Sequence, residues 1–155
     1  ISRLDKFACG PAMIRIHAQG RPYMTRPAIP GISPCFIVRD VTAATSFYCD
    51  MLGFDITHQQ PDQDPFFAIV CRDGAMIFLK SVGVEPLPNR KRHAWARWDA
   101  YVYVPDPDAL ATEFISRGVS FSVPLKDTND GLRGFELEDA DGYVLFFGRP
   151  RENSN

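Results

Sequence analysis

Apolar and polar positions recur along the chain with spacings that predict two amphipathic helices. Over 42–52 the apolar side chains fall at every third or fourth position, which places them on one helix face. Asp40 or Thr42 is suited to cap the start of this helix, and Gly53 is suited to its C-terminal cap. A second helix is predicted over 107–117, with proline in its first turn and glycine directly after its end.

Short runs of apolar and β-branched residues predict the strands. The pairs Asp73-Gly74 and Asp141-Gly142 each lead into such a run, and Asp-Gly favours a tight hairpin turn. We expect 81–96 to be a linker and 126–131 to be a polar loop. The strands are expected at 32–38, 54–57, 67–72, 75–80, 99–104, 119–123, 133–138 and 144–149.

The chain repeats itself, because the same half-sequence occurs twice in the same order. Val38-Arg39-Asp40 and the phrase Leu52-Gly53-Phe54 have echoes at 104–106 and 117–119, and the run 73–79 has an echo at 141–147. A repeat of this length indicates a duplicated supersecondary module. The prediction is therefore an α+β domain of two tandem βαβββ modules, 31–81 and 97–150, whose curved and mostly antiparallel sheet surrounds a cleft.

Composition restricts the function classes. The net charge of −2 gives no electrostatic reason to expect nucleic acid, and no apolar run approaches the ~18 residues of a membrane-spanning helix. The four cysteines form no Cys-x-x-Cys pair, so reduced thiols in a cytoplasmic protein are expected. The basic stretch 90–93 is expected to be a solvated loop. Residues 1–30 are expected to be an extension of uncertain role, with Met24 as one candidate start, and 151–155 to be a tail.

The residues resemble a known superfamily. The phrases Val38-Arg39-Asp40, Phe47-Tyr48, Leu52-Gly53-Phe54 and Asp139-Ala140-Asp141-Gly142-Tyr143, set in duplicated βαβββ modules, are similar to those of the vicinal oxygen chelate group. This group includes glyoxalase I, extradiol dioxygenases and bleomycin-resistance proteins, and the resemblance covers residues 31–150. It implies a homodimer with two equivalent clefts.

The resemblance also carries the positions of a metal site. Enzymes of the group bind a divalent metal through the first and last strands of each module, which here gives Ser33, Asp99, Phe78 and Phe146. Phenylalanine cannot donate to a metal and serine is a poor ligand at neutral pH. We therefore expect no metal, no cofactor and no catalytic residue of the metal-dependent kind.

Strand alternation predicts the lining of the cleft. The residues that share one face are mainly aromatic, with few polar groups, as in a small-molecule pocket. The predicted ligand-binding set is Ser33, Cys35, Met76, Phe78, Asp99, Tyr101, Tyr103 and Phe146 on this face, with Trp98 near the edge of the cleft.

Each of these residues also has a structural interpretation. Phe78 and Phe146 are equally suited to fill the core, and Tyr101 with Tyr103 to form a dimer interface. Asp99 is suited to cap a strand end.

The leading hypothesis is a non-catalytic, homodimeric binding protein that sequesters a small aromatic ligand, cationic or neutral, as bleomycin-resistance proteins do. The alternatives are a glyoxalase- or dioxygenase-like enzyme with an atypical or absent metal site, using Asp99 or Glu136 as base, and a scaffold without a ligand.

Overall fold

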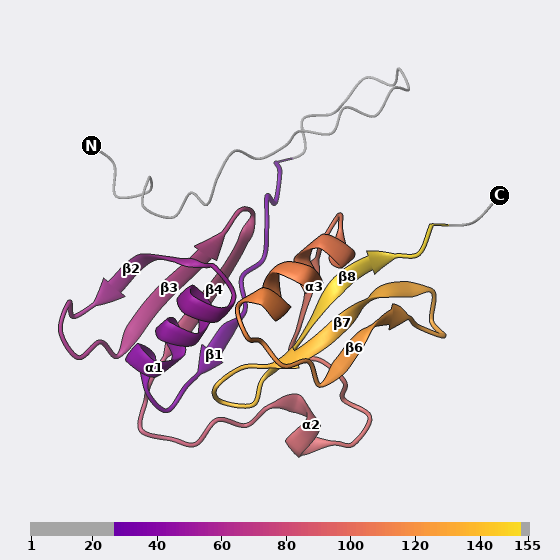
Figure 1. The fold of residues 1–155 in the computed structure, drawn as a ribbon. Helices are drawn as coiled ribbons and strands as arrows, with labels where there is room; N and C mark the ends of the chain where they lie inside the picture. Colours follow the sequence, from indigo (N-terminus) through magenta and orange to yellow (C-terminus); the bar gives the residue numbers. More distant parts are fainter. Residues whose placement is uncertain (1–26, 153–155) are drawn as a thin grey trace.

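The computed structural model describes residues 27–152, which form two βαβββ modules (Figure 1). The predicted α+β class and the duplication are confirmed. The first module consists of β1 (Cys35–Ile37), α1 (Val41–Ser46), the π-helical segment η2 (Phe47–Met51), β2 (Asp55–Gln60), β3 (Phe67–Arg72) and β4 (Ala75–Lys80). After the short α2 (Asn89–Arg92), the second consists of β5 (Ala100–Tyr103), α3 (Pro107–Ser116), β6 (Val123–Asp127), β7 (Leu132–Glu138) and β8 (Val144–Pro150).

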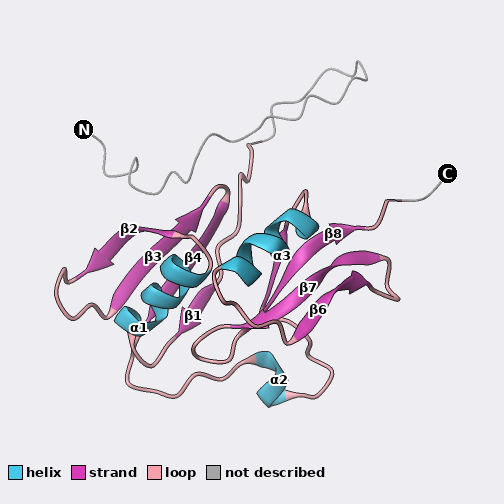
Figure 2. Cartoon of the chain, in the orientation of Figure 1, coloured by secondary structure: helices cyan, strands magenta, loops and turns pink. Residues whose placement is uncertain are grey.

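The strands form two sheets of the same topology, which lie side by side (Figure 2). Their orders are β1-β4-β3-β2 and β5-β8-β7-β6, with one parallel pair in each and antiparallel pairs otherwise. Cys35 lies opposite Phe78 in the first sheet, and Tyr101 lies opposite Phe146 in the second. The two phenylalanines are therefore equivalent positions of the two modules.

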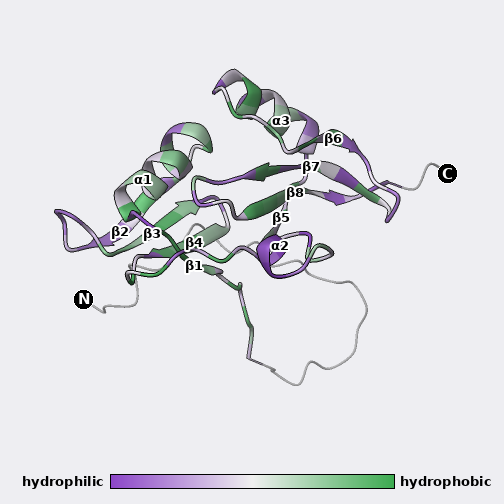
Figure 3. Ribbon diagram, turned by 90° about the horizontal axis from the view of Figure 1, so that it is seen from below, coloured by the Kyte–Doolittle hydropathy of each residue, from purple (hydrophilic) through white to green (hydrophobic). Residues whose placement is uncertain are grey.

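Both long helices cover the same side of the sheets (Figure 3). The core between helices and strands contains Ile77 and Leu79 from β4, and Leu145 and Phe147 from β8. Phe114 of α3 is fully buried there, and its ring lies edge-on to that of Phe147, with centroids 5.4 Å apart. This placement confirms the predicted phase of the strands, because the alternate residues of β4 and β8 then face away from the helices.

Several boundaries differ from the prediction. The helix predicted over 42–52 begins at Val41 and changes to π-helical geometry from Phe47 to Met51. β1 is shorter than the predicted 32–38, and Ile32 is exposed in the coil that precedes it. β2 continues to Gln60, beyond the predicted end at 57.

The prediction for β6 was wrong. Instead of 119–123, the strand spans Val123–Asp127 and takes in part of the predicted polar loop. Val119 remains with the end of α3, since its N–H donates to the Phe114 carbonyl and its side chain is buried. β6 is an edge strand, where Pro124 is tolerated, although a proline inside a run argues against a strand on sequence alone.

The two Asp-Gly turns also differ from one another. Arg72 pairs with Ala75, so Asp73-Gly74 closes a two-residue hairpin as predicted. Glu138 pairs with Val144, so the second connection is a five-residue loop in which Gly142 has a φ of 87°. Within residues 27–152, no helix is long and apolar enough to cross a membrane.

Candidate ligand-binding cleft

An aromatic cluster occupies the helix-free face of the second sheet. Phe146 is 1% exposed, and its ring stacks against Trp98 with centroids 4.4 Å apart and planes inclined by 24°. Tyr101 lies 5.2 Å from the same ring, centroid to centroid. Tyr101 and Tyr103 are 41% and 58% exposed. A buried ring thus forms a floor, and partly exposed aromatic side chains stand beside it.

Two glycines make room for this floor. A Cβ on Gly134 or Gly148 would lie 2.5 Å or 2.6 Å from atoms of the Phe146 ring. Both residues lie on the strands beside or containing Phe146, and they pair with each other across β7 and β8. The absence of their side chains allows the ring to lie close to the backbone of the sheet.

A carboxylate lies beside the aromatic cluster. Glu136 pairs with Phe146 across the sheet, and its Oε1 accepts a hydrogen bond of 2.7 Å from Trp98 Nε1. The guanidinium of Arg97 lies over the Trp98 ring at 4.4 Å and pairs with Asp130 at 2.7 Å. A cavity of about 560 Å³ adjoins these groups, bounded by Phe146, Gly134, Glu136 and Arg97 and by the 126–130 segment. The cavity is large enough for a small organic molecule.

Asp99 lies at the edge of this region, where its carboxylate is already engaged. Its Oδ1 accepts the N–H of Asn89 and its Oδ2 accepts the N–H of Val144, both at 2.8 Å. These bonds join the linker to β8. The charged group directed at the aromatic cluster is therefore Glu136, and Asp99 holds the surrounding backbone in place.

The equivalent face of the first sheet is more apolar. Phe78 is half-buried, and its ring lies edge-on to that of Phe67, with centroids 5.9 Å apart. Cys35 is exposed beside Phe78, whereas Ser33 lies in the coil before β1. This face offers a thiol and aromatic surface but has no counterpart of Glu136, because Ile69 takes the position opposite Phe78.

Met76 contributes to a second cavity, which lies between the two modules. Its volume is about 520 Å³, and Tyr101 and Tyr103 line it from the second module. Ile77 and Phe114 reach it from the core. The tyrosines therefore border both the open face and the boundary between the modules. Burial raises the pKa of Tyr101, and the neighbouring Tyr103 adds to this shift.

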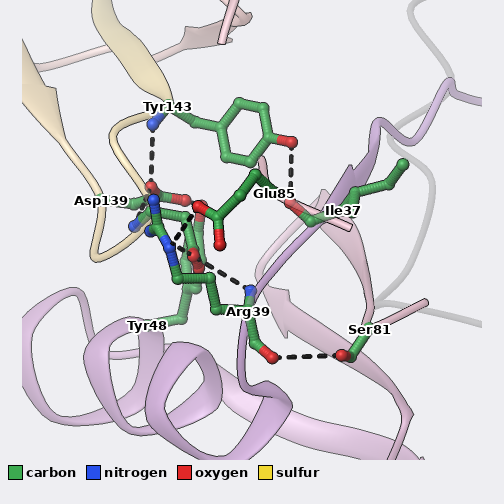
Figure 4. A network of polar contacts seen from close by, with 8 residues as sticks. Ile37, Arg39, Tyr48, Ser81, Glu85, Asp139 and Tyr143 are labelled. Atoms are coloured by element: carbon green, nitrogen blue, oxygen red, sulfur yellow. Dashed lines mark hydrogen bonds and ion pairs between the residues drawn. The ribbon is translucent and has the colours of Figure 1, made fainter. Parts of the chain in front are cut away.

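A polar network joins the modules behind the cleft (Figure 4). Tyr48 donates a 2.8 Å hydrogen bond to Asp139 Oδ2, and Tyr143 donates one of 2.7 Å to the Ile37 carbonyl. Arg39 bridges Asp141 and Glu85. Burial raises the pKa of Asp139 to about 6 although it accepts several hydrogen bonds, and burial with the nearby carboxylate raises that of Tyr48. The network fixes one module relative to the other.

Comparison with known proteins identifies the family. A family model described as the Glyoxalase/Bleomycin resistance protein/Dioxygenase superfamily matches residues 31–147. The chain belongs to this superfamily. No curated protein sequence matches the chain.

Solved structures of the superfamily share the fold. The bleomycin-binding protein of bleomycin-producing Streptomyces verticillus, complexed with copper(II)-bleomycin, is 26% identical with a TM-score of 0.58, covering 79% of this chain and 97% of its own. TnmS3, an antibiotic-binding protein from Streptomyces sp. CB03234, is 26% identical with a TM-score of 0.59, covering 81% and 99%. A superfamily member from Alicyclobacillus acidocaldarius is 19% identical with a TM-score of 0.63, covering 79% and 92%.

The side chains at the expected metal-ligand positions of this chain do not fit the metal site of the superfamily's enzymes. Phe78 and Phe146 have no donor atom, and the Asp99 carboxylate is engaged by two backbone amides. Residues 27–152 contain no group of three or more histidine, cysteine, aspartate or glutamate side chains that is able to hold a metal ion. Tetrahedral or octahedral coordination requires more donors than these positions supply.

The predicted ligand-binding set lacks both Glu136, which was named only as a candidate base, and Arg97. On β7, Glu136 and Arg133 lie on opposite faces. Arg133 reaches Asp108 on the helix side, whereas Glu136 faces the aromatic cluster. The cross-strand pairing of Glu136 with Phe146 is the signal that places the Glu136 side chain on the open face of the sheet.

Proposed function

We propose that this protein is a non-catalytic binding protein that sequesters a small aromatic molecule on the open sheet face of its second module. The observation that carries the proposal is the fixed ring of Phe146, with Trp98 and Tyr101 around it and a cavity of about 560 Å³ at its side. Offset or edge-on aromatic contacts of this kind are each worth about 0.5–1.5 kcal/mol beyond the area that they bury.

The superfamily relatives support this choice over an enzyme. The two neighbours at 26% identity are a bleomycin-binding protein and an antibiotic-binding protein. The donors expected of a metal-dependent member are replaced by Phe78 and Phe146. Among residues 27–152, neither Ser33 nor the free Cys35 of the predicted set has a hydrogen bond to a histidine. These features favour binding over the enzyme alternative.

We further infer that a second copy of the chain completes the cleft. Tyr101, Tyr103 and Ile37 expose apolar surface on the helix-free side, where one chain leaves the sheets uncovered. Exposed aromatic and aliphatic side chains of this kind are suited to an interface between two copies. The predicted set Ser33, Cys35, Met76, Phe78, Trp98, Asp99, Tyr101, Tyr103 and Phe146 would then line two clefts, with Glu136 added and Asp99 in a supporting position.

A thermal-shift screen tests the proposal. The purified protein is heated with bleomycin, with a panel of neutral and cationic aromatic compounds, and separately with divalent metals and a chelator. A ligand at about 100 times its Kd adds roughly 2.7 kcal/mol, which raises Tm by about 5–10 °C for a domain of this size. A shift with aromatic compounds that persists in chelator supports the proposal. A shift with metal ions alone would support the enzyme alternative.

A further inference from the structure

Beside the cavity at Phe146, two negatively charged side chains lie around one positively charged side chain, that of Arg97. Glu136 and Asp130 both reach Arg97, at 3.5 Å and 2.7 Å. The third nearby carboxylate, Asp127, is already paired with Arg133 at 3.0 Å. Two carboxylates are therefore directed at the position that the Arg97 guanidinium occupies.

The surroundings of Arg97 are those that a planar cation prefers. Its guanidinium lies 4.4 Å from the centre of the Trp98 ring, within the distance at which a cation is attracted to an aromatic face. Trp98 is held in turn by Phe146 on the sheet and by the hydrogen bond to Glu136. The ring and the carboxylate thus form a rigid pair that does not depend on Arg97 for its geometry.

Arg97 itself is held weakly. Its side chain is 49% exposed and that of Asp130 is 48% exposed, whereas that of Glu136 is 15% exposed. Exposed ion pairs contribute little to stability, so moving the Arg97 side chain into solvent costs little free energy. After this movement, the half-buried carboxylate of Glu136 has no cation beside it. An incoming cation with the same shape restores the contacts that Arg97 gives up.

We propose that the Arg97 guanidinium occupies a subsite that binds a planar cationic group of an organic ligand. The class is a guanidinium, an amidinium or a protonated aromatic amine, stacked on Trp98 with its charge toward Glu136 and Asp130. This inference rests on the proposed function, since it assumes that the open face binds a ligand. The subsite therefore predicts a cationic ligand, and Arg97 of the same chain competes with that ligand for Trp98, Glu136 and Asp130.

Two dyes of similar shape separate charge from stacking. Proflavine is a planar aromatic cation and acridone is a neutral analogue, and fluorescence titration measures the Kd of each. Removing a competing side chain increases the fraction of protein that is ready to bind and lowers the apparent Kd by the same factor. We expect Arg97→Ala to bind proflavine about three- to tenfold more tightly than the wild type, and acridone to gain by up to the same factor, because both dyes stack on the Trp98 face that Arg97 covers.

Two further variants test the role of the carboxylate charge and provide a control. Glu136→Gln retains the oxygen that accepts the Trp98 N–H but removes the charge, so proflavine binding should weaken about fivefold or more. Arg117→Ala, which removes an ion-paired arginine directly after α3 on the helix side of the sheet, should leave both dyes unaffected. Melting curves of each variant establish that it is folded.

The outcomes distinguish the two proposals. If Arg97→Ala leaves proflavine binding unchanged or weakens it while the dyes still bind, the cation subsite is wrong and the proposed function stands. If neither dye binds to any folded variant, the proposed function is contradicted together with the subsite.

Discussion

Phe146 leaves no room for a side chain on Gly134, because a Cβ there would lie 2.5 Å from the Cζ of the ring. The same Cβ would lie 2.3 Å from the carbonyl oxygen of Phe147. The floor of the cleft is therefore fixed by close contact between an aromatic ring and bare backbone. Phe146 is 1% exposed, so it supports Trp98 and Tyr101, which present the aromatic surface. A surface that is already ordered does not have to be ordered again when the ligand binds.

Gly134→Ala should destabilise the protein by about 1–3 kcal/mol, the usual cost of forcing extra volume into a packed site. The measurement is chemical denaturation followed by circular dichroism. Gly74→Ala is the matched control, because a Cβ there has nothing within 4 Å and should change stability little. Equal stability of both variants would show that the Phe146 ring and the Phe147 carbonyl both move away from the new Cβ, so that the position of the ring is not fixed.

The stability of the fold should depend on pH through Asp139. Its pKa is about 6 in the folded protein, above the ordinary value of 3.8, because burial disfavours the ionised carboxylate. As pH rises from about 4 to about 6, the unfolded chain releases this proton first, so Asp139 lowers the free energy of unfolding by roughly 2–3 kcal/mol.

Asp139→Asn tests this, because the amide oxygen still accepts the N–H groups of Asp141 and Tyr143. The free energy of unfolding is measured for both proteins at about pH 4.5 and about pH 7.5. The wild type should lose stability relative to the variant between these values. Carboxylates with lowered pKa, such as Glu113 beside Arg72, act in the opposite direction but cancel in this difference. A constant difference would mean that Asp139 titrates normally.

The parts of the fold that the sequence predicts well are those in which packing and periodicity agree. β3 and β4 have the predicted bounds because both are largely apolar and are joined by a tight Asp-Gly turn. The position of β6 was wrong because its partner, β7, selects the register and three of its own five residues, Pro124 among them, are exposed. Likewise, the loop after β7 is longer than an Asp-Gly hairpin, since the Asp139 carboxylate holds two of its amides.

The site is less predictable for a related reason. Alternation places Phe146 on the open face, but the ring stack with Trp98 and the hydrogen bond to Glu136 depend on how the residues before β5 cross the sheet. No local pattern specifies that crossing. Asp99 illustrates the same point, because its two backbone partners are remote from each other in sequence.

The inferred dimer makes a prediction for Tyr103, which is 58% exposed on the helix-free face. Tyr103→Glu places a charge on that surface and should weaken self-association tenfold or more, equivalent to about 1.4 kcal/mol. Tyr103→Phe is the control, as it retains the ring. Light scattering coupled to size exclusion gives the mass, which for a wild-type dimer is twice the 17.4 kDa of one chain. A wild-type mass of one chain at high protein concentration would contradict the dimer.

The most direct test of the binding account uses Trp98 as its own reporter. Trp95, which is 87% exposed, is replaced by phenylalanine, so that Trp98 is the remaining tryptophan of the chain's two. The variant is titrated, in the presence of chelator, with bleomycin, proflavine and neutral aromatic compounds. The account predicts a saturable change in Trp98 fluorescence with at least one aromatic compound, abolished by Phe146→Ala in a variant that remains folded. A fluorescence that none of the compounds changes, or that changes only when a divalent metal is supplied, would contradict it.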